Sequence, residues 1–157
     1  MQVMAETFTQ LYTHIIFAVR DYKSFIHQDR ESEIFGILND IVTHNGHQPL
    51  IIDGTSNHVH ILIKQNPTNA ISDLVRELKR QSSFYINHHL LNNPSFHWQE
   101  GYIAFSHTRS QVNAVYKYIA KQKIYHQNRD FKEEYLELMN REDDANDDET
   151  IFKYKYQ

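Results

Sequence analysis

The 157-residue chain contains no cysteine and no apolar run long enough to cross a membrane. The absence of cysteine excludes disulfides and thiolate metal sites, so any metal ligand must be histidine, a carboxylate, an amide or water. Without a long apolar run, no membrane-spanning helix is expected. The first ten residues also lack the charged start and apolar block of a signal peptide. These absences together predict a cytoplasmic protein.

The amino-acid composition is that of a folded domain. Hydrophobic residues make up 40% of the chain and aromatic residues 13%, which is too much for a disordered protein. The length corresponds to one domain that can bury a sizeable core, and no internal repeat is present. We expect a single domain over residues 1–141, followed by an acidic tail over residues 142–157.

The net charge of −4 is distributed unevenly along the chain. Residues 1–63 hold 3 Lys/Arg and 7 Asp/Glu, residues 64–129 hold 9 and 3, and residues 130–157 hold 4 and 10. A basic block therefore lies between two acidic segments. Local charge matters more than total charge for a phosphate-bearing partner. On charge alone, an ordinary solvated surface explains the basic block equally well.

Hydrophobic periodicity predicts an α+β domain. Segments rich in β-branched and aromatic residues predict strands at residues 8–19, 48–53, 57–63 and 98–106. Helical spacing of apolar residues predicts helices at residues 28–45, 70–91, 108–125 and 131–139. Up to the fourth strand this order is the ferredoxin-like pattern, a four-stranded antiparallel sheet with two helices on one face. The last two helices are additions to it.

Two histidines stand in the third predicted strand. Because strand residues alternate between faces, His58 and His60 point one way and the β-branched residues between and after them point the other, towards the core: Val59, Ile61 and Ile63. Two imidazoles side by side could bind one divalent metal. Paired histidines on a half-exposed strand are also common as plain polar surface.

A second pair of polar residues lies in the helix predicted at residues 108–125. Tyr118 and Gln122 are four residues apart and so share one face of the helix. We place them beside its apolar stripe, which consists of Val112, Val115, Tyr116 and Ile119. On its own, a boundary tyrosine over a surface glutamine explains this spacing.

The combination of these motifs is more specific than either motif alone. A histidine pair flanking one apolar residue, a ferredoxin-like order and a downstream Tyr-x-x-x-Gln together resemble the single-tyrosine HUH transposases. This family includes small insertion-sequence and REP-associated enzymes that cut and rejoin single-stranded DNA. The resemblance runs from about Tyr12 to Met139 and includes four segments: Tyr12–Phe17, Ile71–Arg76, Trp98–Tyr102 and Tyr118–Gln122. Tyr125-His126 stands where the family often has two adjacent histidines, so the resemblance assigns His126 no role.

The resemblance implies a chemistry for these residues. His58, His60 and Gln122 would hold Mg²⁺ or Mn²⁺, which neutralises the charge of a phosphodiester. Tyr118 would attack phosphorus, forming a 5′-phosphotyrosine and releasing a 3′-hydroxyl. The ester keeps the bond energy, so no nucleotide cofactor is needed. A tyrosine of ordinary pKa needs a proton acceptor, which the sequence does not identify.

The resemblance also implies partners. The family acts on a DNA hairpin at each element end, bound by a homodimer in which the tyrosine helix of one subunit can complete the histidine site of the other. No membrane partner is implied. Aromatic residues in the basic block could stack bases, although core packing explains most of them. The candidates for phosphate contacts are Lys64, Arg76, Lys79, Arg80, Arg109, Lys117, Lys121 and Lys123.

Two alternatives remain open at this point. A domesticated relative could bind hairpin DNA or RNA without cutting it, although an intact set of four candidate residues argues against this. A metal-dependent phosphodiesterase could use water in place of tyrosine, and a covalent protein–DNA adduct would separate the two enzyme classes. A two-histidine phosphoesterase needs a second His-x-Ser/Thr element, which His107-Thr108-Arg109 does not supply.

Overall fold

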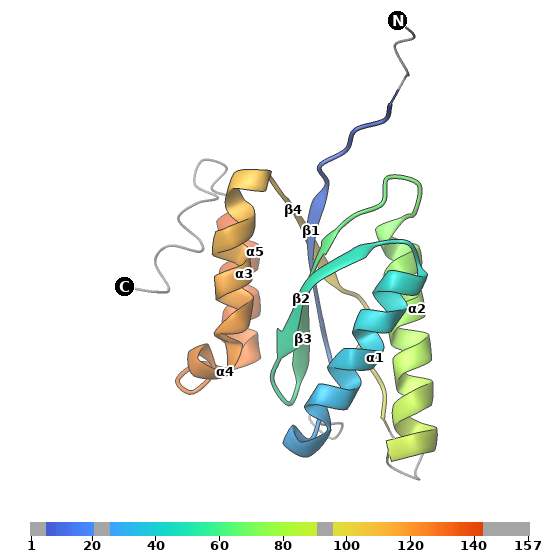
Figure 1. The fold of residues 1–157 in the computed structure, drawn as a ribbon. Helices are drawn as coiled ribbons and strands as arrows, with labels where there is room; N and C mark the ends of the chain where they lie inside the picture. The colour runs from blue at the N-terminus through green and yellow to red at the C-terminus, as the bar shows by residue number, and fades with distance from the viewer. Residues whose placement is uncertain (1–5, 21–25, 91–95, 143–157) are drawn as a thin grey trace, which may run out of the picture.

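The computed structural model describes residues 6–20, 26–90 and 96–142, so residues 143–157 of the expected acidic tail lie outside the described part (Figure 1). The strands are β1 (Tyr12–Ala18), β2 (Gln48–Gly54), β3 (His58–Lys64) and β4 (Ile103–His107). The α-helices are α1 (Glu31–His44), α2 (Ile71–Tyr85), α3 (Val112–Ala120), α4 (Gln122–Tyr125) and α5 (Phe131–Glu142). Short 3-10 turns precede α1 and α3, at Gln28–Arg30 and Arg109–Gln111, and a π-helical turn, Ile86–Leu90, follows α2.

The four strands form one sheet in the order β2-β3-β1-β4, with every neighbouring pair antiparallel. This strand order confirms the predicted ferredoxin-like fold. Helices α1 and α2 cover one face of the sheet, whereas α3 and α5 lie on the other (Figure 1). Across the described residues, no helix combines the length and apolarity that a membrane crossing requires.

The main core lies between the sheet and helices α1 and α2. Leu38 of α1 and Leu78 of α2 are fully buried there. They pack with the side chains that β3 directs to this face, namely Val59, Ile61 and Ile63. The alternation predicted for the histidine strand is therefore present, and it leaves the opposite face of β3 for other groups.

Two predicted elements differ from the structure. Regular strand pairing of β4 begins at Ile103 and not at Trp98, because Gly101 has a φ of +85° that interrupts the extended chain. Trp98 forms only an isolated bridge with Val19, and its indole donates a hydrogen bond to Ser82 at 2.8 Å. The helix predicted at residues 108–125 is broken at Lys121, so that α4 follows α3 as a separate turn.

A glycine fixes the turn that leads into the histidine strand. A Cβ atom on Gly54 would lie 2.2 Å from the backbone oxygen of His58 and 2.9 Å from Cα of Val59. We therefore expect Gly54→Ala to lower the free energy of unfolding by about 1–3 kcal/mol, because backbone atoms must shift. Denaturant unfolding followed by circular dichroism measures this change.

The matched control is Gly36→Ala in α1, where no atom lies within 4 Å of the added Cβ. Alanine is favoured over glycine in a helix by up to about 1 kcal/mol, so this variant should be as stable as the parent or more stable. Equal stability of the two variants would contradict the close approach of the β2–β3 turn.

Candidate active site

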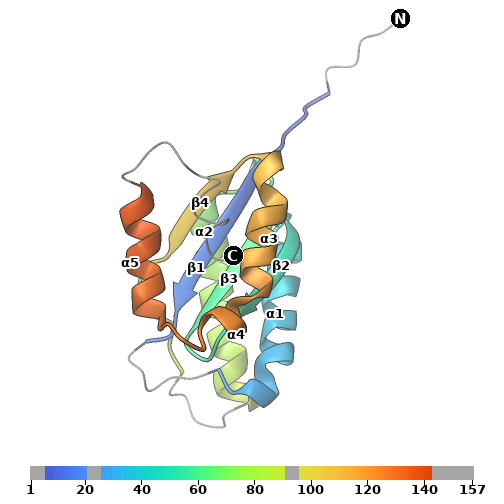
Figure 2. The same ribbon diagram turned by 90° about the vertical axis from the view of Figure 1, so that its left-hand side faces the viewer.

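His58 and His60 lie side by side on the sheet face opposite the main core. Both side chains are fully buried. Their cross-strand partners on β1 are Ala18 and Ile16, respectively. Figure 2 shows α3 and α5 flanking this face, with α4 near its lower end. The histidines are therefore not the half-exposed surface pair that the sequence left open as an alternative.

Tyr118 of α3 faces the histidines. Its ring centroid lies 5.7 Å from that of His60. The prediction that Tyr118 lies beside the apolar stripe was wrong, because the side chain is fully buried in a small core with Leu62, Val115 and Ile119. The reason is that α3 packs on the sheet through the face that carries Tyr118. Burial, together with the adjacent Glu134 carboxylate, raises the pKa of Tyr118 well above its usual value.

Gln122 begins α4, directly after the break at Lys121. Its side-chain oxygen Oε1 lies 3.1 Å from Nε2 of His58 and 3.0 Å from Nε2 of His126. Its amide nitrogen lies 3.5 Å from the backbone oxygen of Tyr118. The four residues of the two sequence motifs thus meet in one buried cluster, although they come from two distant segments of the chain.

Glu134 of α5 completes the cluster and was missed by the sequence analysis. Its side chain is fully buried, with Oε1 2.6 Å from Nε2 of His60 and Oε2 2.7 Å from Nε2 of His126. The sequence holds one signal that could have found it. Glu134 lies four residues before the buried Leu138, so it occupies the apolar face of an amphipathic helix where a carboxylate is unexpected.

Burial and neighbouring charges set the protonation of these groups. Burial, with the neighbouring His60, lowers the pKa of His58 to about 3. Burial alone would raise the pKa of the Glu134 carboxyl, but His60 and His126 hold it well below its usual range. At neutral pH the cluster therefore contains an uncharged His58 and an ionised Glu134.

Polar neighbours contact the Nδ1 atoms of both histidines. Nδ1 of His58 lies 2.8 Å from Oδ1 of Asn57, which can fix the orientation of the ring. Nδ1 of His60 lies 2.8 Å from Nε2 of His14, which can fix the orientation of that ring. The remaining Nε2 atoms of both histidines then face Glu134.

These groups fit a cation. The ligand atoms offered by His58, His60 and Glu134 all lie within 4.8 Å of one another. Nε2 of His60 and Oε1 of Glu134 are buried without an aligned hydrogen bond, although only 2.6 Å separates them. Two imidazoles and a carboxylate are ligands that divalent first-row metals accept.

Comparison with known proteins shows the family of the chain. The model of the family described as IS200-like transposase matches residues 7–122, which include both histidines, the tyrosine and the glutamine. The chain belongs to this family. The match confirms the resemblance seen in the sequence, and it ends before α5 begins.

Individual relatives support the assignment to the IS200-like transposases. The ISDra2 transposase TnpA of Deinococcus radiodurans is 31% identical over 74 residues, which cover 47% of this chain and 53% of that protein. The chain thus matches about half the length of this curated relative. The fold is shared with a candidate transposase from D. radiodurans R1, at a TM-score of 0.61 and 23% identity over 78% of this chain and 98% of that one. The fold is also shared with a REP-associated tyrosine transposase bound to a REP hairpin. The TM-score is 0.59, with 13% identity over 80% of this chain and 74% of that one.

Three of the predicted phosphate-contacting residues of this IS200-like transposase lie on α2, across the sheet from the histidine cluster (Figure 1). Arg76 and Arg80 each form an ion pair with an acidic residue of the same helix. Lys79 donates hydrogen bonds of 2.7 and 2.5 Å to the backbone oxygens of Gln99 and Gly101. Lys79 therefore holds the loop before β4, a role that the sequence analysis did not consider.

The remaining basic candidates lie on or near the α3 side. Lys117 and Lys121 are exposed at the end of α3. Lys123 of α4 forms ion pairs with Asp53 and Glu31. The last two candidates lie at the end of the sheet farther from His58: Arg109, bonded to the Tyr12 hydroxyl, and Lys64, at the end of β3. The structure thus does not gather the eight basic residues into one patch.

Proposed function

We propose that this IS200-like transposase cuts and rejoins single-stranded DNA through a covalent bond between Tyr118 and a 5′-phosphate, with the help of a divalent metal. The observation that carries this proposal is the buried cluster in which Tyr118 meets His58, His60 and Gln122. A protein that only binds DNA has no need of a fully buried tyrosine beside two histidines and a carboxylate.

The metal ligands in this proposal are His58, His60, Glu134 and Gln122, and the metal is Mg²⁺ or Mn²⁺. When bound, such an ion neutralises charge on a phosphate oxygen and thereby makes phosphorus a better electrophile. Two neutral imidazoles and an amide leave the charge of the ion unchanged, whereas Glu134 reduces it by one. The carboxylate in turn favours metal binding by attraction.

Tyr118 is the nucleophile in this proposal. Its oxygen forms a bond to phosphorus, the bond from phosphorus to the 3′-oxygen of the neighbouring nucleotide breaks, and a 3′-hydroxyl is released. The raised pKa of Tyr118 keeps its hydroxyl protonated at neutral pH, so the proton must be removed during the attack. The proton acceptor in this proposal is the Glu134 carboxylate, whose charge helps to raise the pKa of Tyr118.

The substrate in this proposal is a DNA hairpin with a single-stranded flank, and the active form is a homodimer. One protein of the same fold was solved bound to a REP hairpin, which supports the substrate, whereas the homodimer is what the sequence resemblance implies. Within the single chain described here, Tyr118 already lies beside His60. Sedimentation of the protein with and without a hairpin measures the number of subunits.

A denaturing gel of labelled hairpin DNA incubated with protein and Mn²⁺ tests the proposed reaction. A slow-migrating band that disappears after protease treatment is the expected result, because the strand stays attached to Tyr118. Shortened DNA without such a band would indicate a phosphodiesterase that uses water. Hairpin binding with neither product would indicate a binding protein without cleavage activity.

Salt dependence of DNA affinity separates basic residues that contact phosphate from those that do not. For single strands, the slope of log affinity against log salt changes by about 0.7 for each neutralised phosphate. We expect Lys117→Ala and Lys121→Ala each to flatten the slope by about this amount, because both are exposed on the α3 side. Fluorescence anisotropy of a labelled hairpin at several salt concentrations measures the slope.

The matched control for this titration is Arg80→Ala on the opposite side of the molecule, where Glu77 already neutralises the guanidinium. Its slope should equal that of the parent protein. A slope flattened equally by all three substitutions would show that the DNA is not confined to the α3 side.

A further inference from the structure

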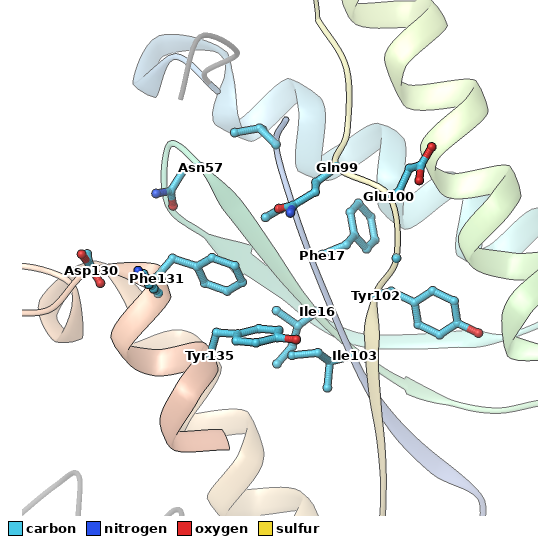
Figure 3. Close-up of a pocket in the computed structure, with 14 residues that line it drawn as sticks. Ile16, Phe17, Asn57, Gln99, Glu100, Tyr102, Ile103, Asp130, Phe131 and Tyr135 are labelled. Atoms are coloured by element: carbon cyan, nitrogen blue, oxygen red, sulfur yellow. The ribbon is translucent and has the colours of Figure 1, made fainter. Parts of the chain in front are cut away.

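A cavity of about 460 Å³ lies beside the histidine cluster, between α5 and the start of β4 (Figure 3). Its floor includes Ile16 of β1 and Ile103 of β4. Phe131 and Tyr135 of α5 form one wall, and the loop that carries Tyr102 forms another. Figure 3 shows the rings of Phe131 and Tyr135 directed towards the two isoleucines.

The cavity adjoins the proposed active site. Ile16 pairs across the sheet with His60, so the floor of the cavity is the next strand on the same sheet face. The ring of Phe131 stacks on His58 at a centroid distance of 4.3 Å, with 23° between the rings. Asn57 both lines the cavity and contacts Nδ1 of His58. One DNA strand could therefore place a group in the cavity and a neighbouring phosphate at the cluster.

We propose that this cavity binds one unpaired nucleobase of the DNA strand, next to the phosphate that the cluster attacks. The proposal rests on the proposed function, in which single-stranded DNA is the substrate. Aromatic rings stack on bases whatever their sequence, and base–aromatic stacking contributes about 1–3 kcal/mol per base. Bases that leave their own stack are bound between apolar and aromatic side chains.

Exposure of the lining supports an occupant of this kind. Tyr102 and Tyr135 are 42% and 40% exposed, although both line a concave site. Apolar walls with a few polar groups are typical of pockets that bury a planar ligand, and a volume of this size suffices for one nucleotide. Asn57 and Gln99 line the cavity, and their side-chain amides can hydrogen-bond the edge of a base.

The loop before β4, which forms the second wall, is held in place by Lys79 of α2. Lys79 bonds the backbone oxygens of Gln99 and Gly101, and its ammonium lies 5.5 Å from the centre of the Phe17 ring. Gly101 has positive φ, and no atom lies within 4 Å of a Cβ built on it. The Trp98–Tyr102 segment thus presents a fixed, open backbone to the cavity, and Lys79 acts as a positioning residue.

The opposite wall comes from a part of the chain outside the family match. That match ends at residue 122, whereas Phe131 and Tyr135 belong to α5. The cavity therefore combines a segment inside the family match, on β1 and the loop before β4, with a helix outside it. It would contribute a contact to the strand that residues 7–122 alone do not supply.

Binding of an oligo-dT strand of about 12 nucleotides, compared with an abasic strand of the same length, tests the proposal without metal or cleavage. Both strands carry the same phosphates, so their difference in anisotropy-derived affinity reports contacts to bases. We expect the parent protein to bind oligo-dT at least about tenfold more tightly, which corresponds to about 1.4 kcal/mol. Tyr135→Ala should remove most of this preference and leave affinity for the abasic strand unchanged.

The matched control is Phe84→Ala, which removes an aromatic ring that is 60% exposed on α2. It should keep the full preference for oligo-dT. Tyr102→Ala is a second cavity variant, expected to reduce the preference in the same direction if Tyr135→Ala proves unstable. An undiminished preference in both cavity variants, or an equal loss in the control, would overturn the proposal.

The binding preference and the adduct assay test the cavity and the proposed reaction separately. A protein that prefers oligo-dT through Tyr135 but never forms an adduct supports the cavity and contradicts the transposase reaction. A protein that forms the adduct but binds both strands equally retains the reaction and loses the cavity.

Discussion

Replacement of Tyr118 by phenylalanine is expected to abolish the covalent protein–DNA adduct, while hairpin affinity stays within about twofold of the parent value. The substitution removes one hydroxyl from a fully buried ring and keeps the packing of that ring against Leu62 and Val115. The loss of a single hydrogen bond should lower the free energy of unfolding by about 1 kcal/mol. The gel assay for the adduct and a thermal melt measure the two effects separately.

The matched control is Tyr125→Phe, because the Tyr125 ring lies 6.0 Å from that of Tyr118 and its hydroxyl bonds Glu137 instead of the histidines. This variant should form the adduct at the parent level. An undiminished adduct in Tyr118→Phe, with loss in Tyr125→Phe, would transfer the role of nucleophile to Tyr125.

Removal of either histidine is expected to abolish measurable Mn²⁺ binding and metal-dependent cleavage. Imidazole nitrogen binds first-row metals more tightly than an amide oxygen does, so Gln122→Ala should weaken binding less than His58→Ala or His60→Ala. Calorimetric titration with Mn²⁺ measures the order. His44→Ala, which removes an exposed histidine from α1, is the control and should bind as the parent does. Full Mn²⁺ binding in the double histidine variant would eliminate the site.

Two substitutions at Glu134 separate its possible roles within the same titration. Glu134→Gln keeps an oxygen ligand but removes the negative charge and the base, so it should weaken Mn²⁺ binding in part and slow adduct formation. Glu134→Ala also removes the oxygen ligand and should weaken binding more strongly. Parent-level adduct formation by Glu134→Gln at saturating Mn²⁺ would mean that the carboxylate acts only as a ligand.

The sequence predicted the fold because its signals are local. Alternation along β3 separates the histidines from Val59 and Ile61, and that alternation alone determines which face enters the main core. The spacing of Tyr118 and Gln122 likewise survives the break at Lys121, since Gln122 still reaches His58. At these two positions the local pattern and the geometry agree.

The rest of the candidate site depends on contacts between distant segments, which local patterns do not encode. Glu134 reaches His60 across 74 positions because α5 returns along the sheet, and nothing near Glu134 specifies that return. The basic block is a similar case. The sequence gives only the number and order of the charged residues. The structure shows that Lys79 bonds backbone oxygens and that Lys123 pairs with acidic residues.

The alternation of β3 also limits how this protein can evolve. Val59, Ile61 and Ile63 serve folding, whereas His58 and His60 serve the proposed chemistry, and all five are fully buried. Inserting or deleting one residue within the strand would exchange the two sets, placing imidazoles in the core and isoleucines at the ligand positions. Descendants of this sequence can therefore lengthen their loops, but the interior of this strand must keep both its length and its order.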